Sequence, residues 1–151
     1  MKYKRPESVL VVVYCTTTER VLMLQRKDDQ DFWQSVSGSL EEGETPFQAA
    51  KREVWEELGI RLEEQQGQLY DCQQEVDFEI FPQFYHRYAP GTRYCHEYWF
   101  TLAFTDEITV HLTEHTDYQW VEAEQAMRLT KSWNNAAAIE KFILKKKTTQ
   151  N

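Results

Sequence analysis

The sequence predicts an α/β fold in which helices cover both faces of a mixed β-sheet. The predicted elements run as strands, a helix, more strands and final helices, and this order is typical of such a sheet. The chain has 151 residues, of which 41% are hydrophobic and 28% charged. This length and composition suit one globular domain that spans residues 1–151.

The charge balance restricts the classes of partner. The chain carries 17 Lys and Arg residues against 25 Asp and Glu residues, a formal charge of −8. Such a chain lacks the basic face of a nucleic-acid binder, so no nucleic-acid partner is expected. An acidic protein still binds a small polyanion when divalent cations lie between the two, so a cluster of carboxylates is expected.

The expected location is the cytoplasm, without a membrane contact. The apolar run at residues 9–14 is too short to cross a bilayer. The three cysteines form no CxxC pair, which favours reduced buried thiols over a disulfide framework. A monomer or a weak homo-oligomer is expected.

The first third of the chain predicts strands. Residues 8–15, SVLVVVYC, form a continuous β-branched run, which suits a strand buried on both faces. Residues 20–27 follow a turn and are the expected partner strand. Residues 33–37 predict a short strand that leads into Gly38, and residues 39–44 an acidic loop.

Residues 45–58 carry the clearest helix signal. Thr45 suits the N-cap, Pro46 the first helical position, and Gln48 completes a capping box with Thr45. Gly59 lies just past the last turn, where a left-handed residue ends a helix. Both ends of this helix are therefore predicted.

The rest of the chain adds strands and then helices. The segment 68–81 alternates polar and apolar residues and holds one or two strands, and the segment 82–94 is a long loop rich in Pro and Gly. Further strands are predicted at 95–104 and 117–121, and helices at about 122–129 and 133–146.

One face of the 45–58 helix is strongly acidic. Glu53, Glu56 and Glu57 are spaced i, i+3 and i+4, so their carboxylates lie next to one another and repel. The neighbouring Arg52 cannot neutralise all three. A divalent cation, Mg²⁺ with Mn²⁺ as a substitute, would neutralise them. On these three residues alone, a solvated acidic face is the more common arrangement, so the choice between the two depends on the surrounding string.

The string GSLEEGETPFQAAKREVWEELGI, residues 38–60, resembles the Nudix box. That pattern is Gly, five residues, Glu, seven residues, Arg-Glu, an aliphatic residue, any residue, Glu-Glu, any residue, Gly and an aliphatic residue. Its defined positions are filled by Gly38, Glu44, Arg52, Glu53, Val54, Glu56, Glu57, Gly59 and Ile60. The resemblance implies an α/β/α sandwich around a mixed sheet and divalent-metal hydrolysis of a substituted diphosphate.

The resemblance also implies roles within the box. The expected catalytic residues are Arg52, Glu53 and Glu56, and which glutamate acts as general base stays open. The expected metal ligands are the Gly38 carbonyl and the side chains of Glu53, Glu56 and Glu57. Glu44 is expected to pair with Arg52 and so to hold the loop to the helix.

A fourth acidic ligand outside the box is common in this family, and two positions compete for the role. Glu97 lies in a predicted strand, and Glu114 in a predicted loop before a Trp-containing strand. We favour Glu114, because a loop carboxylate can swing toward the metal cluster. Glu97 is then expected at a solvent-facing strand position.

Strings outside the box are similar to the bacterial dihydroneopterin triphosphate diphosphatases, a Nudix subfamily. They are YKRP, LQRKDD, FWQSVSGSLEEGET, DFEIF, HRYAPG, LTEH and LTKSWNN. This similarity implies cleavage of dihydroneopterin triphosphate to the monophosphate and pyrophosphate in folate biosynthesis. It also implies a side activity on nucleoside triphosphates such as dATP.

Eight residues are candidates for contact with such a substrate. Phe78 and Phe81 would sandwich a flat pterin or purine, with Glu79, Ile80 or a backbone group at the ring edge. The alternative is an ordinary strand with Phe78 and Ile80 in the core. The candidate phosphate contacts are Lys4, Arg26, Ser37 and, at the start of the last helix, Ser132.

Two other functions remain open. One is a cleansing pyrophosphatase for damaged or excess nucleoside triphosphates. The other is a Nudix-like sensor that binds a ligand without cleaving it. The intact Glu53, Glu56 and Glu57 argue against the sensor, because binding alone does not need all three.

Overall fold

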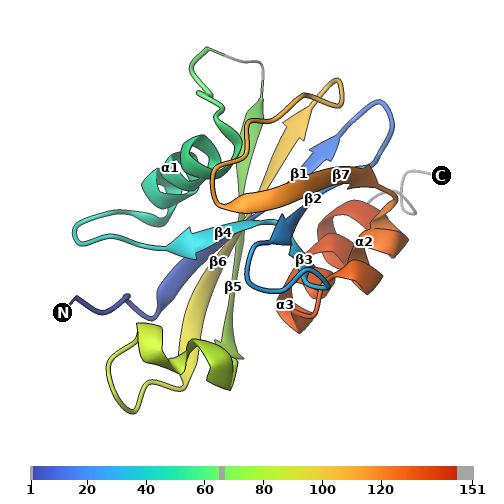
Figure 1. The fold of residues 1–151 in the computed structure, drawn as a ribbon. Coiled ribbons are helices and arrows are strands. Elements are labelled where there is room, and N and C mark those ends of the chain that lie inside the picture. Colours follow the sequence, from blue (N-terminus) through green and yellow to red (C-terminus); the bar gives the residue numbers. More distant parts are fainter. Residues whose placement is uncertain (1, 65–66, 146–151) are drawn as a thin grey trace.

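The computed structural model describes residues 2–64 and 67–145 and contains a seven-stranded mixed sheet between two helical layers (Figure 1). The strands are β1 (Glu7–Cys15), β2 (Val21–Arg26), β3 (Trp33–Gln34), β4 (Val36–Ser39), β5 (Gln68–Glu79), β6 (Tyr94–Phe104) and β7 (His115–Val121). The helices are α1 (Pro46–Leu58), the 3-10 helix η1 (Pro82–Arg87), α2 (Ala123–Leu129), α3 (Trp133–Ile139) and the π-helix η2 (Glu140–Leu144). The predicted fold class is confirmed.

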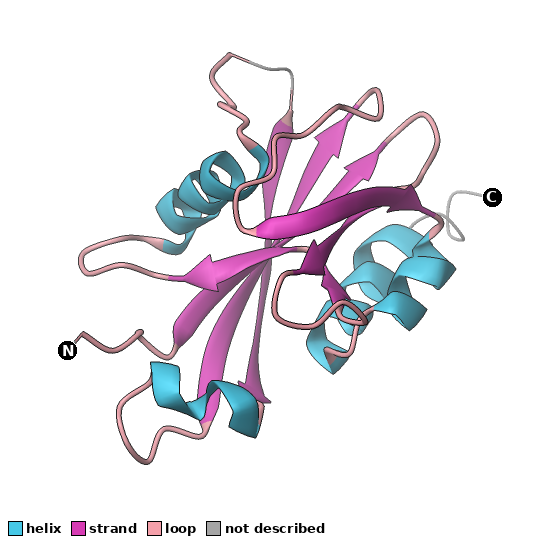
Figure 2. Ribbon diagram, viewed as in Figure 1, coloured by secondary structure: helices cyan, strands magenta, loops and turns pink. Residues whose placement is uncertain are grey.

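The sheet is built around β1. The strand order is β3-β2-β1-β6-β5, while β4 pairs with β1 and β7 with β2 (Figure 2). β1 and β6 run parallel, and the other strand pairs are antiparallel. Because β1 has neighbours along both edges, its backbone lies inside the sheet.

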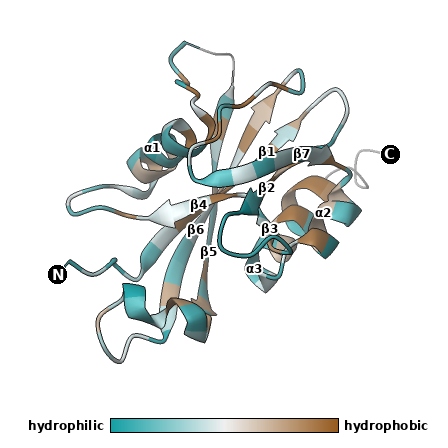
Figure 3. Ribbon diagram, viewed as in Figure 1, coloured by the Kyte–Doolittle hydropathy of each residue, from teal (hydrophilic) through white to brown (hydrophobic). Residues whose placement is uncertain are grey.

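The side chains of β1 enter two separate cores. Val9, Val11 and Val13 pack into the core under α1, and Leu10 and Val12 into the core under α2 and α3. This alternation confirms the prediction that the β-branched run is buried on both faces. The helices themselves carry both hydrophobic and hydrophilic residues, as expected for helices with one buried face (Figure 3).

The predicted ends of α1 are also confirmed. The Thr45 side chain accepts a hydrogen bond from the Gln48 N–H, and the Gln48 side chain accepts one from the Thr45 N–H. At the other end, Gly59 adopts a left-handed conformation with φ of 70°. These local contacts fix where the acidic face begins and ends.

Two predicted boundaries were wrong. The strand predicted at 33–37 is split into β3 and β4, which places Gly38 inside β4. The loop predicted at 82–94 begins with η1, because a proline suits the first turn of a helix. The prediction of one or two strands at 68–81 is confirmed, since this segment forms one strand, β5, whose register with β6 shifts between Asp71 and Gln74.

The last predicted helix is also divided. α3 ends at Ile139 and the chain continues as the π-helix η2, while residue 146 of the prediction lies outside the described residues. Within residues 2–64 and 67–145, no helix is both long and apolar enough to cross a membrane.

Candidate functional site

A cavity of about 460 Å³ lies where β4, the end of β5, η1 and the start of α3 meet. All eight predicted substrate residues line it: Lys4, Arg26, Ser37, Phe78, Glu79, Ile80, Phe81 and Ser132. Gly38, Glu57 and Glu114 line the same cavity. Residues from both ends of the chain and from its middle therefore share one space.

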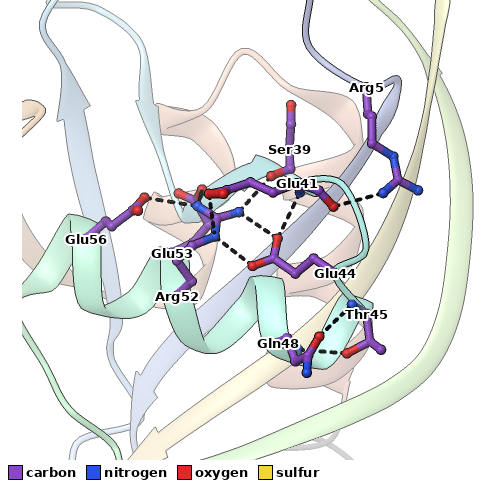
Figure 4. Close-up of polar contacts among 9 residues, drawn as sticks. All are labelled: Arg5, Ser39, Glu41, Glu44, Thr45, Gln48, Arg52, Glu53 and Glu56. Atoms are coloured by element: carbon purple, nitrogen blue, oxygen red, sulfur yellow. Dashed lines mark hydrogen bonds and ion pairs between the residues drawn. The ribbon is translucent and has the colours of Figure 1, made fainter.

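Arg52 joins the loop to helix α1 at the edge of this site (Figure 4). Its guanidinium donates to Glu44 at 2.8 and 2.9 Å, and also to Glu53 at 2.6 Å and to Glu56 at 3.0 Å. A further bond of 2.9 Å reaches the backbone carbonyl of Ser39. The predicted pairing of Glu44 with Arg52 is confirmed, and it lowers the pKa of Glu44.

Gly38 allows β4 to approach α1. A Cβ atom at this position would lie 2.1 Å from the carboxyl carbon of Glu53, closer than atoms in contact allow. The bare glycine backbone therefore lies directly against the Glu53 carboxylate.

The three glutamates of the acidic face differ in burial. Glu53 and Glu57 are 8% and 1% exposed, whereas the side chain of Glu56 is 45% exposed. Burial raises the pKa of Glu53 and, more strongly, that of Glu57, and the negative charges of Glu53 and Glu114 raise the pKa of Glu57 further. The acidic face thus has a buried pair and one exposed member.

The donor set fits a hard divalent cation. Glu57 Oε2 is buried and has no hydrogen-bond partner among the described residues, and nearby carboxylates add negative charge. Carboxylate and carbonyl oxygens are the ligands that Mg²⁺ and Mn²⁺ prefer. Within residues 2–64 and 67–145, however, no three His, Cys, Asp or Glu side chains converge closely enough to ligate one ion. Arg52 occupies the carboxylates of Glu53 and Glu56 instead.

His115 is a site residue that the sequence did not predict. Its Nδ1 lies 3.7 Å from Glu57 Oε1 and has no hydrogen-bond partner in the part of the chain described. Burial lowers the pKa of His115 to about 4, and the positive charge of Arg26 lowers it too. The imidazole is therefore neutral at pH 7. The one indication in the sequence that His115 belongs to the site is its position directly after Glu114.

Glu97 and Glu114 occupy different environments. Glu97 is 3% exposed, which shows that the expected solvent-facing position was wrong. Trp99 Nε1 and Asn134 Nδ2 donate to its Oε1 at 3.0 and 2.7 Å, and burial raises its pKa to about 7. Glu114 is exposed at the rim, and its charge acts on Glu57.

Aromatic rings form one wall of the cavity. The Phe81 ring contacts the rings of Phe32 and Phe84, with centroids 6.0 and 6.2 Å apart. Phe78 is half-buried, and Ile80 is 2% exposed. Phe32 and Phe84 were not predicted, because Phe32 lies between the strands predicted at 20–27 and 33–37, and Phe84 lies in a segment predicted to be a loop.

Two cationic side chains stack on this aromatic wall. Arg26 lies over the Phe84 ring at 4.6 Å, and its Nε and Nη2 each donate to the Asp28 carboxylate at 2.7 Å. Arg87, also not predicted, stacks on the same ring at 4.8 Å. Burial lowers the pKa of Lys4, whose backbone N–H donates to the Arg87 carbonyl at 2.9 Å.

Comparisons with known proteins agree with this geometry. The family model described as the NUDIX domain matches residues 4–142. The dihydroneopterin triphosphate diphosphatase of Escherichia coli (strain K12) is 56% identical over 142 residues, which cover 94% of this chain and 95% of the relative. The enzyme of the same name from Haemophilus influenzae is 50% identical and covers 95% of this chain and 90% of the relative.

A solved structure shares the whole architecture. The E. coli dihydroneopterin triphosphate pyrophosphohydrolase superposes with a TM-score of 0.93 at 55% identity, covering 96% of this chain and 99% of that one. A family match over residues 4–142 and relatives of this identity leave no doubt about the assignment, and the chain belongs to the Nudix family.

Proposed function

We propose that this chain, acting as a single domain, hydrolyses dihydroneopterin triphosphate to the monophosphate and pyrophosphate. The observation that carries the proposal is the identity of 56% over nearly the whole length of an enzyme with this activity in its name. The cavity supports it independently, because acidic, cationic and aromatic groups line one space.

The triphosphate is assigned to the cationic residues of the cavity. Lys4, Arg26 and Arg87 offer positive charge there, and Ser37 and Ser132 offer hydroxyl groups. A planar guanidinium donates two parallel hydrogen bonds to a phosphate, and the rings under Arg26 and Arg87 hold those groups in place.

Nudix enzymes typically depend on a divalent metal ion. We assign the ion, Mg²⁺ or Mn²⁺, to Glu53, Glu56, Glu57, the Gly38 carbonyl and, from the rim, Glu114. When bound, it neutralises phosphate charge and makes water a better nucleophile. The attacking water loses its proton to a carboxylate of this cluster, Glu53 or Glu56. Arg52 is a positioning residue, since it holds both of these side chains.

The ring of the substrate is assigned to the aromatic wall. Phe78 and Phe81 present flat apolar surfaces beside Ile80 and Glu79. Stacking on aromatic rings tolerates different bases, and each stacked base contributes about 1–3 kcal/mol. We therefore expect dATP to be accepted as a poorer substrate. Phe78→Ala and Phe81→Ala would weaken binding of the ring without abolishing metal binding.

A substrate panel tests the proposal. It includes dihydroneopterin triphosphate, dATP and 8-oxo-dGTP with Mg²⁺, and pyrophosphate and orthophosphate are assayed separately. We expect the highest kcat/KM for the pterin and release of pyrophosphate. Orthophosphate as the sole product would refute the bond assignment. Preference for 8-oxo-dGTP would make the chain a cleansing enzyme, and no turnover at all would make it a sensor.

A further inference from the structure

Glu97 lies on the floor of the cavity, on the side of the sheet covered by α2 and α3. In the sheet register, Ser8 of β1 is its neighbour on one side, and Phe78 pairs with Cys95, two residues before Glu97 on β6. Residues two apart in a strand share a face. Glu97, Ser8 and Phe78 therefore point into the same space, and all three line the cavity.

The hydrogen bonds of Glu97 are unevenly divided between its two oxygens. Oε1 accepts from both Trp99 and Asn134. The Asn134 amide is itself oriented, because its oxygen accepts from the Ser132 hydroxyl at the start of α3. No described residue donates to Oε2. A carboxylate oxygen accepts about two hydrogen bonds, so Oε2 keeps both acceptor positions for a ligand.

We propose that Glu97 is the specificity-determining residue of the ring pocket, and that its Oε2 accepts the adjacent ring N–H and amino N–H of a 2-amino-4-oxopyrimidine edge. The pterin ring carries that edge. The aromatic wall accepts any flat ring, so selectivity has to come from a polar group at the ring edge. Glu97 is a buried carboxylate that lines the cavity beside Phe78, whereas the other one, Glu57, belongs to the acidic face of α1.

Other bases present different edges to Glu97. Guanine carries the same pair of donors as the pterin, whereas adenine carries one amino group beside a ring nitrogen that accepts hydrogen bonds. An acceptor that faces a carboxylate is unfavourable, so Glu97 disfavours adenine as well as favouring the pterin. The expected order of ring preference is therefore pterin and guanine above adenine.

The test is Glu97→Gln, measured as kcat/KM on dihydroneopterin triphosphate, dGTP and dATP. The amide replaces one acceptor with a donor, which mismatches the pterin edge and matches adenine. A hydrogen bond to a charged group supports a fall of about 10- to 100-fold for the pterin and dGTP. Turnover of dATP should stay within about threefold of wild type or rise. Glu75→Gln, the same change at a side chain 55% exposed on β5, is the control.

An equal loss on all three substrates, or no loss on the pterin, overturns the proposal. If Glu97→Gln does not fold, Glu97→Asp serves instead, because it keeps the charge and withdraws it by one methylene. The pterin-to-dATP ratio should then fall, and an unchanged ratio overturns the proposal. Direct titration with neopterin, followed by its fluorescence, should show weaker binding in both variants, and wild-type affinity would also overturn the proposal.

This inference rests on the proposed function, and the experiment separates the two. A wild-type protein that cleaves dGTP and dATP but not dihydroneopterin triphosphate contradicts the proposed function. The dGTP-to-dATP ratio of Glu97→Gln still decides the role of Glu97 in that case, because guanine carries the same donor edge.

Discussion

Single carboxylates differ in what they contribute to this site, and burial is the reason. Glu53 and Glu57 are buried against β4, and Glu56 faces solvent and the guanidinium of Arg52. Replacement by glutamine keeps the volume of each side chain and removes its charge. Activity and stability are therefore expected to respond differently at the three positions.

We predict that Glu53→Gln, Glu56→Gln and Glu57→Gln each reduce kcat by about 10²- to 10⁴-fold and leave the fold intact. Glu57→Gln should also raise the melting temperature of the metal-free protein at pH 8, because a buried charge is removed. Glu56→Gln should leave that temperature nearly unchanged. Steady-state kinetics and thermal melts check this, and full activity in all three variants would refute the assignment of the acidic face.

The outer carboxylates give a second contrast. We predict that Glu114→Gln costs far more turnover of dATP than Glu97→Gln, because the Glu114 charge acts on Glu57 and Glu97 faces the ring pocket. The measurement is kcat against Mg²⁺ concentration for both variants. If Glu97→Gln needed a higher Mg²⁺ concentration for half-maximal kcat than Glu114→Gln, Glu97 and not Glu114 would be the residue that acts on the metal.

At the scale of elements, the junction of β4 with α1 holds the acidic cluster. We predict that Gly38→Ala abolishes most activity, because the new Cβ would lie 2.1 Å from the present position of the Glu53 carboxyl carbon and so displaces that carboxylate. Thr45→Ala, at the other end of the same loop, is the control: it removes the N-cap and costs about 1 kcal/mol of stability. Thr45→Ala should keep wild-type kcat. Comparable kcat in the two variants would contradict this account.

The same junction shows what the sequence predicts well. Both ends of α1 were predicted because Thr45, Gln48 and Gly59 act through contacts within a few residues. The separation of β3 from β4 was not predicted, because it depends on Ser35. The Ser35 N–H donates at 2.8 Å to Asn135, a residue 100 positions away. Pairings at that distance leave no local pattern.

Glu97 and His115 illustrate the limit inside the site. Alternation along β6 indicates that neighbouring residues face opposite sides, but it does not say which side holds a polar cavity. Glu97 is buried because α3 brings Asn134 to it from 37 residues away. The motif strings predicted which residues line the cavity, whereas burial and pairing emerge only from the folded chain.

At the scale of the whole molecule, buried titratable groups make stability depend on pH. Glu97 binds its proton more tightly when folded, with a pKa of about 7 against 4.5, and burial raises the pKa of Glu57 as well. Stability from such groups is complete below pH 4.5 and lost as the pH rises through the folded pKa. His115 has a lowered pKa and acts in the opposite sense. As the pH falls below 6.5, the unfolded chain binds a proton at His115 that the folded chain does not, so the folded protein becomes less stable.

We predict that the metal-free protein is more stable at pH 5.5 than at pH 8, with Glu97 alone contributing about 2 kcal/mol of the difference. Urea unfolding at the two pH values measures it. Glu97→Gln should show a smaller difference than wild type. An equal difference in wild type and in Glu97→Gln would contradict the raised pKa of Glu97, because His115 contributes equally to both proteins.

The central position of β1 has a consequence for synthesis of the chain. β1 leaves the ribosome before the other strands, yet its parallel partner β6 begins only at Tyr94. The hydrogen bond from Ser35 likewise cannot form until Asn135 has been synthesised. A nascent chain that ends before β6 therefore exposes one edge of its most apolar strand. Because these contacts span so much of the sequence, folding completes only after Asn135 has emerged, and the substrate cavity is the last feature to form. Until then, the nascent chain offers an apolar strand edge to chaperones and to aggregation.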